Sequence, residues 1–184
     1  MTDIQRYKWF WPWQDQKEEA WLESMSETGL HLESVHLPCV YRFNQGKPQR
    51  YTYRLDYILV NRDQKSEYLQ IFQDAGWEHL GEMSNWQYWR KQFVEGETAE
   101  IFTDRESKLK KYQRMLGVMG FFLFFLAFLG FNMLTNWSHF EDVPAWISAI
   151  YAGGMICYAV LIPIYIAVVV QLLRRISQLK KKSI

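Results

Sequence analysis

The sequence contains only two cysteines, too few for a protein held together by disulfide bonds or by a cysteine-rich zinc site. Cys39 lies in the charged N-terminal part and Cys157 lies within a long apolar run, so no bond between them is expected. The four histidines lack the spacing of metal ligands. The sequence therefore predicts neither a metal nor another cofactor.

Catalytic sequence motifs are also missing. The chain has no glycine-rich phosphate loop, and no GxSxG, HExxH or paired CxxC pattern. Basic clusters occur only beside the long apolar runs and in the C-terminal tail, which leaves no broad basic surface for phosphates. These absences predict a protein that is not an enzyme and that does not bind nucleic acid directly.

Charge is almost absent from residues 115–173, where only Glu141 and Asp142 are charged. Residues 115–134 form an uncharged run long enough for a helix to cross roughly 30 Å of hydrocarbon. A second uncharged run, residues 146–173, is longer still and contains Pro163. The pattern predicts two transmembrane helices.

The distribution of cations predicts how these helices are oriented. Arg114 ends a basic segment before the first run, and Arg174 and Arg175 begin another after the second, whereas residues 135–145 contain no Lys or Arg. Basic flanks stay in the cytoplasm. The N-terminus lacks the apolar core of a signal peptide. We therefore expect a cell-membrane protein with both ends in the cytoplasm and Trp137 and Trp146 at the membrane interface.

An internal repeat organises the N-terminal part. With an offset of 47 residues, WLESMSETGL aligns with YLQIFQDAGW, and each copy has an apolar helical stripe closed by Gly29 or Gly76. Aromatic and β-branched residues typical of strands follow each glycine. The repeat units are expected at about residues 14–60 and 62–103.

The order helix, strand, strand in each unit predicts an α+β fold. We expect residues 31–43 to form a hairpin with residues 50–60, and residues 77–92 to form a shorter one with residues 94–104. Four antiparallel strands would then make one sheet, with both helices on one face. The expected organisation is a cytoplasmic domain (1–103), a juxtamembrane helix (104–114) continuous with the first span (115–134), an outer loop (135–145), the second span (146–173) and a basic tail (174–184).

Large rings and charges alternate along the predicted strands. They either pack as core and rim, or form a surface for a partner protein, a second copy or a ligand. The candidate residues for such a surface are Tyr41, Arg42, Tyr53, Arg54, Asp56, Trp86, Tyr88, Trp89 and Arg90.

The N-terminal segment YKWFWPWQ concentrates aromatic residues around Pro12. It fits three roles: lying at the lipid interface, packing under the sheet, or serving as a hook for another protein.

The phrases FWPWQDQKEEAWLESMSETGLHL, YTYRLDY, YLQIFQDAGWE and WQYWRK, followed by a membrane hairpin, resemble the DUF2812 family of small bacterial membrane proteins. The resemblance covers roughly residues 7–114. It implies no catalytic residue, because the family has no established activity. It implies a functional link to PadR-like transcription regulators, beside which members are often encoded.

Together these patterns predict a membrane-anchored interaction or sensor module with a regulatory role. Its cytoplasmic domain would bind a protein partner, a second copy or a small ligand. The alternative is an accessory subunit of a larger membrane complex, in which the spans make the essential contacts.

Overall fold

The computed structural model describes residues 3–59, 61–96, 105–136 and 144–181. The chain forms two compact units, Met1–Arg114 and Met115–Ile184. The long helix α3 (Arg105–Thr135) begins in the first unit and continues in the second.

The first unit follows the same path twice: strand, helix, strand, strand. Each half forms a three-stranded antiparallel sheet in which its last strand lies in the middle, with the orders β1-β3-β2 and β4-β6-β5. The internal repeat therefore includes a strand before each helix, which the sequence pattern did not reveal. The elements are β1 (Asp3–Tyr7), α1 (Asp15–Glu27), β2 (Leu30–His36), β3 (Val40–Gln45), β4 (Tyr51–Tyr57), α2 (Arg62–Asp74), β5 (Glu78–Met83) and β6 (Trp86–Gln92).

The predicted four-stranded sheet is wrong, because a turn interrupts residues 31–43. Pro38 has no N–H to donate to a ladder, and Cys39 has a positive φ of 65°. The chain therefore reverses here, so that β2 pairs with β3. β4 was expected to pair with residues 31–43. It belongs to the second half and pairs there with β6.

The second predicted hairpin is displaced in the same way. Ser84 and Asn85 both have positive φ, the backbone of a two-residue turn whose twist suits a hairpin. Residues 77–92 thus contain two strands, β5 and β6, paired with each other. Part of the expected return strand, residues 97–104, lies outside the described residues.

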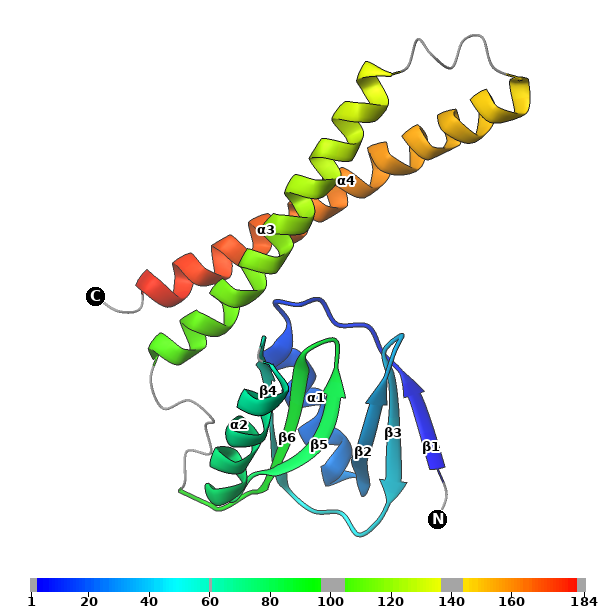
Figure 1. Ribbon diagram of the computed structural model, residues 1–184. Helices are drawn as coiled ribbons and strands as arrows, with labels where there is room; N and C mark the ends of the chain where they lie inside the picture. Colours follow the sequence, from blue (N-terminus) through cyan, green and yellow to red (C-terminus); the bar gives the residue numbers. More distant parts are fainter. Residues whose placement is uncertain (1–2, 60, 97–104, 137–143, 182–184) are drawn as a thin grey trace. The chain divides into compact units, whose positions relative to one another are not determined.

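The two helices lie on opposite faces of the β4-β6-β5 sheet, and the prediction of one shared face is wrong. Successive residues of a strand point to opposite faces. On β6, Tyr88 joins the core around Leu22 of α1, whereas Trp89 packs with Phe72 of α2. In Figure 1, α1 lies behind β5 and β6, and α2 is seen to the left of these strands.

Strands β2 and β5 bring the two sheets together. They lie side by side without a hydrogen-bonded ladder, so the strands follow one another as β4, β6, β5, β2, β3, β1 (Figure 1). α1 contacts β2 from one sheet and β4 from the other. Its buried Leu22 consequently shares one core with Phe43 of β3 and Tyr53 of β4.

The second unit consists of the rest of α3 and the helix α4 (Ala145–Lys181). Both helices are long and apolar enough to cross a membrane, and their side chains are mostly exposed. Trp146 lies exposed at the start of α4. Trp137, the other expected interface residue, is outside the described residues.

Tyrosines of α4 connect the two long helices at intervals of seven residues. Tyr151 donates a hydrogen bond to the Met133 carbonyl, Tyr158 to that of Leu126, and Tyr165 to that of Met119. A side chain at Gly130 would overlap the ring of Tyr158. Hydrogen bonds and small residues of this kind hold helices together in an apolar environment, where burial of apolar surface alone does not.

The two glycines that close the repeated helices allow a direct test of the fold. Both have positive φ, +87° at Gly29 and +81° at Gly76. A Cβ on Gly29 would lie 2.6 Å from the carbonyl oxygen of Gly46, whereas a Cβ on Gly76 would meet, among the described residues, only the Lys91 side chain at 3.6 Å. Gly76→Ala should cost about 1–2 kcal/mol from its backbone conformation, and Gly29→Ala should cost roughly 3 kcal/mol or more.

The measurement is urea unfolding of the full-length protein in micelles, followed by near-ultraviolet circular dichroism. Equal losses of stability in the two variants would contradict the close approach of Gly29 and Gly46.

Candidate functional site

Most rings of the predicted aromatic surface are interior. Tyr41, Tyr53, Tyr88 and Trp89 are each at most 1% exposed. They therefore line the core, and the described residues offer no open aromatic face at these positions. Trp86 is partly buried at the start of β6, where its ring contacts that of Tyr57.

The predicted polar candidates are not brought together into one pocket. Arg90 forms a two-pronged ion pair with Glu78, and Arg54 donates to Glu23 at 2.9 Å. Arg42 is exposed on the central strand β3.

Asp56 is fully buried on the face of the β4-β6-β5 sheet that α2 covers. It accepts a hydrogen bond from the Tyr68 hydroxyl of α2, and Arg114 lies 3.8 Å away. Burial raises the pKa of this carboxyl, whereas Lys111, the Tyr68 hydroxyl and Arg114 act to lower it.

A cluster of buried carboxylates at the start of α1 was missed by the sequence analysis. Asp15, Glu18 and Glu19 are all buried. Acidic residues are common in a first helical turn, so the sequence alone gives no sign that these three side chains are buried. The buried state of three carboxylates so close together requires partners for each of them.

Asp15 pairs with the first turns of α3. The Lys111 ammonium donates to Asp15 at 2.6 Å, and the Tyr112 hydroxyl donates to the same carboxylate at 2.8 Å. Lys111 also donates to the carbonyl of Leu55 on β4. One buried ammonium therefore connects α1, α3 and β4 within the first unit.

Glu18 pairs with the aromatic core. A single carboxylate oxygen, Oε1, accepts hydrogen bonds from the hydroxyls of Tyr41 and Tyr88, each at 2.7 Å. Burial raises the pKa of this carboxyl, whereas the two hydroxyls act to lower it. These bonds explain why polar hydroxyls from β3 and β6 are found in the core.

Glu19 and Glu23 bind the outer edge of β4. The backbone N–H of Leu55 donates to Glu19 at 2.8 Å, and that of Tyr53 donates to Glu23 at 3.3 Å. Glutamates four residues apart on a helix are spaced by about 6 Å, close to the roughly 6.6 Å between alternate residues of a strand. The helix thus satisfies edge groups that another strand would otherwise pair with.

The cluster is built to hold elements together. Each carboxylate already has a protein donor, and among the described residues no group of three or more His, Cys, Asp or Glu side chains is arranged to hold a metal ion. What the cluster changes is the pKa of its carboxyl groups. Burial raises the pKa of Glu19 to about 8, despite the opposing effect of Lys111.

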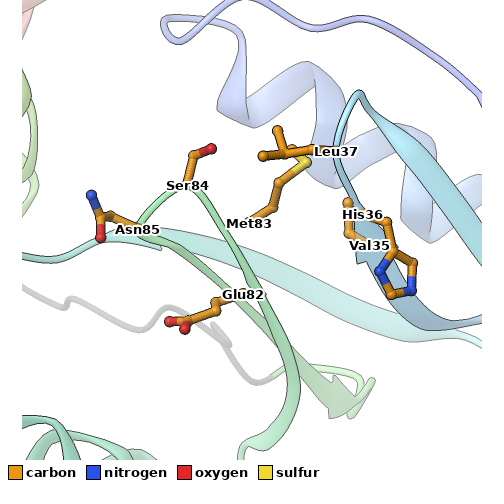
Figure 2. Close-up of a pocket in the computed structure, with 7 residues that line it drawn as sticks. All are labelled: Val35, His36, Leu37, Glu82, Met83, Ser84 and Asn85. Carbon is orange, nitrogen blue, oxygen red and sulfur yellow. The ribbon is translucent and has the colours of Figure 1, made fainter. Parts of the chain in front are cut away.

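A cleft, here called the turn cleft, opens between the tips of the β2–β3 and β5–β6 hairpins. It has a volume of about 410 Å³ and lies between the β2–β3 turn and the β5–β6 turn. In Figure 2, Leu37 and Met83 approach each other across it. Its lining combines apolar and polar side chains: Val35, His36, Leu37, Glu82, Met83, Ser84 and Asn85.

Side chains that line the cleft also contact other residues of the domain. Glu82 accepts hydrogen bonds from Lys65 and Gln87, and Val35 and Met83 reach the core around Leu22. A mixed lining of this size suits a small ligand or one side chain of a partner. Sequence reasoning missed this site because it requires the two turns of different repeats to lie together.

The ion pair between α1 and α3 can be tested by a double-mutant cycle. Asp15→Asn should destabilise the protein by about 3–5 kcal/mol, because the Lys111 ammonium would remain buried without its counter-charge. Adding Lys111→Met should then cost less than the sum of the single changes. The exposed pair of Glu27 and Arg50 is the control, where Glu27→Gln should cost at most about 1 kcal/mol.

Urea unfolding in micelles supplies all four stabilities of the cycle. Additive effects of the two substitutions would show that Asp15 and Lys111 do not interact in solution.

Glu19 should make the stability depend on pH. The folded chain keeps its proton up to about pH 8, whereas the unfolded chain releases it near its ordinary pKa of 4.5. The stabilisation from this proton is complete below about pH 4.5 and is lost as the pH rises to about 8. Glu19→Gln should therefore stabilise the protein more at pH 8 than at pH 5, relative to the unmodified chain.

Unfolding midpoints measured across this range will give the difference, with the exposed Glu33→Gln as the control. A pH-independent effect of Glu19→Gln would mean that Glu19 is ionised throughout the range.

Comparison with known proteins gives one match. The family model described as "Protein of unknown function (DUF2812)" matches residues 14–125. No curated protein and no solved structure matches the chain. The matched region contains α1, all of β2 to β6 and the first part of α3, and thus the carboxylate cluster and the turn cleft.

Proposed function

The chain belongs to the DUF2812 family, and from that premise we propose that it is a membrane-anchored interaction or sensor module with a regulatory role. In this proposal α3 and α4 cross the cell membrane and both chain ends lie in the cytoplasm. Support comes from the apolar length of the helices and from the cations Arg114, Arg174 and Arg175 at their cytoplasmic ends. The first unit then engages a partner or ligand.

The observation that carries the proposal is the buried pairing of Lys111 with Asp15. The same helix that bears Lys111 becomes apolar from Met115 onward. Its cytoplasmic start is therefore held by the ion pair, by the Tyr112 hydroxyl, which donates to the same Asp15 carboxylate, and by a β4 carbonyl that accepts from Lys111. A change in how α1 or β4 is packed would act on α3 directly, as a sensor requires.

The turn cleft is the proposed place of engagement. Val35 and Met83 belong to its lining and pack against the core that contains Leu22 of α1. Occupation of the cleft would thus act on the helix that carries the carboxylate cluster. The functional link to a PadR-like regulator, which the family resemblance implies, names one class of protein for this role.

Site-specific photocrosslinking in native membranes tests the proposal. A photoreactive residue at His36, which lines the cleft, should form a specific adduct, and one at the exposed Lys47 on the other end of β3 should not. Asn85→Gly should weaken the His36 adduct, since it removes a cleft side chain and glycine suits the φ of 67° at this position. Mass spectrometry identifies the adduct.

Three results are informative. A distinct protein or ligand at His36 alone supports the module, and recovery of only the same chain indicates self-association. Identical adducts at His36 and Lys47, unaffected by Asn85→Gly, would contradict engagement at the cleft.

The alternative, an accessory subunit of a larger membrane complex, is favoured by the side chains of α3. Phenylalanines are exposed around this helix, at Phe121, Phe122, Phe124, Phe125, Phe128 and Phe131. Such a surface can pack against other spans as well as lipid. Exchanging residues 115–173 for an unrelated helical hairpin separates the two functions: the His36 adduct survives for the module and disappears for the accessory subunit.

A further inference from the structure

We propose that the end of the first unit formed by its N-terminal aromatic segment and the β2–β3 turn binds the lipid surface. The proposed contact consists of five exposed side chains, here called the apolar rim: Tyr7, Trp9, Trp11, Leu37 and Leu59. Trp9 is 53% exposed and Leu37 is 69% exposed. The inference rests on the proposed membrane anchoring and adds a ligand, the bilayer surface, for the cytoplasmic unit itself.

The strand register places the rim at one end of the sheets. Tyr7 pairs with Val40, the first residue of β3 after the turn that contains Leu37. The following Lys8 donates its N–H to the carbonyl of Cys39 in the same turn. The N-terminal aromatic segment and the β2–β3 turn therefore lie together.

Leu59 belongs to the same end. It follows the last residue of β4, Tyr57, which pairs with Trp86 beside the β5–β6 turn. That turn and Leu37 line one cleft. The exposed apolar residues Ile71 and Val94 are separate, because Ile71 is near the end of α2 and Val94 follows the opposite end of β6.

The Asp15–Lys111 pair connects this aromatic segment to α3 shortly before its apolar run begins. Lys111 is four residues before Met115, where the apolar run begins, a rise of about 6 Å along the helix. Asp15, which Lys111 contacts at 2.6 Å, follows Trp13 by two residues. The aromatic segment is therefore connected, through Asp15, to a residue of α3 that lies about one helical turn before the apolar run.

The chemistry of the rim matches a lipid interface. Trp9, Trp11 and Trp13 form a continuous series of ring contacts, with centroids 5.8 Å and 5.3 Å apart. Tryptophan and tyrosine favour the headgroup region, where the ring is apolar and its polar atom remains hydrated. Arg6 and Lys17 are exposed on either side of the segment and can attract anionic headgroups.

The aromatic segment is also fixed in place, which suits a docking element. Phe10 turns inward and packs against Trp21 and Tyr41. Its neighbours Trp9 and Trp11 consequently turn outward. The alternation separates an inner anchor from an outer surface: Phe10 packs under the sheet, one of the roles predicted for this segment, and Trp9 and Trp11 are left for the lipid contact proposed here.

A depth measurement in lipid nanodiscs tests this inference on the full-length protein. An environment-sensitive fluorophore is attached at Trp11→Cys, Leu37→Cys or Lys47→Cys, each in a Cys157→Ser background, and at the native Cys157 in a fourth sample. Cys39 is buried, and burial raises its pKa, so it remains unlabelled. The nanodiscs contain phosphatidylcholine and phosphatidylglycerol, with or without a lipid that carries a nitroxide near its headgroup.

The expected result is a blue-shifted emission that the nitroxide lipid strongly quenches at positions 11 and 37, and no quenching at position 47. Cys157 reports on the membrane anchoring separately, because it lies within α4. Quenching at 157 without quenching at 11 and 37 would overturn lipid binding by the rim and leave the aromatic segment as a site for a protein. A fluorophore at 157 that remains in water would overturn the membrane anchoring.

Replacing phosphatidylglycerol by phosphatidylcholine gives a further readout. Quenching at position 11 should decrease if Arg6 and Lys17 contribute, while quenching at 157 should be unchanged. The circular dichroism of each labelled variant must match that of the unmodified protein, which ensures that a change of depth is not a loss of folding.

Discussion

The first unit is organised around the buried contact of Lys111 with Asp15 and the carbonyl of Leu55. A buried ammonium is unfavourable unless it has a counter-charge and hydrogen-bond acceptors, and both are supplied here by different elements. The requirement fixes three things at once: the start of α1, the edge of β4 and the first turns of α3. The carboxylates of α1 are tolerated in the interior for the same reason, since each finds donors on strands or on α3.

The fold of the β4-β6-β5 sheet depends on a match between helical and extended spacing. Glu19 and Glu23 present acceptors at an interval close to that of outward N–H groups on β4. The helix therefore covers an edge that would otherwise be open to pairing with another chain. The same contact buries Glu19 against β4, and this burial raises the pKa of its carboxyl.

The sequence predicted the features that depend on local pattern. Two helices closed by Gly29 and Gly76, the repeat offset and the two apolar helices are present in the structure. Strand pairing was predicted wrongly because Pro38 and the Ser84–Asn85 pair, which make the turns, were read as strand interior. β1 was missed because its short strand precedes the aligned segment. Burial of acidic residues has no local signature, since it depends on Lys111, which is 96 residues away from Asp15.

The two repeats share their order of elements but differ in the charge of their helices. At the offset of 47 residues, the acidic positions Asp15, Glu18, Glu19 and Glu23 of α1 correspond to Arg62, Lys65, Ser66 and Gln70 of α2. The two copies share a fold but contact α3 differently: the first copy does so through Asp15 of α1, which pairs with Lys111, and the second through Asp56 of β4, which lies 3.8 Å from Arg114. Helix α1 therefore contacts α3 directly, whereas α2 reaches it through one intermediate, because its Tyr68 hydroxyl donates to Asp56, the carboxylate beside Arg114.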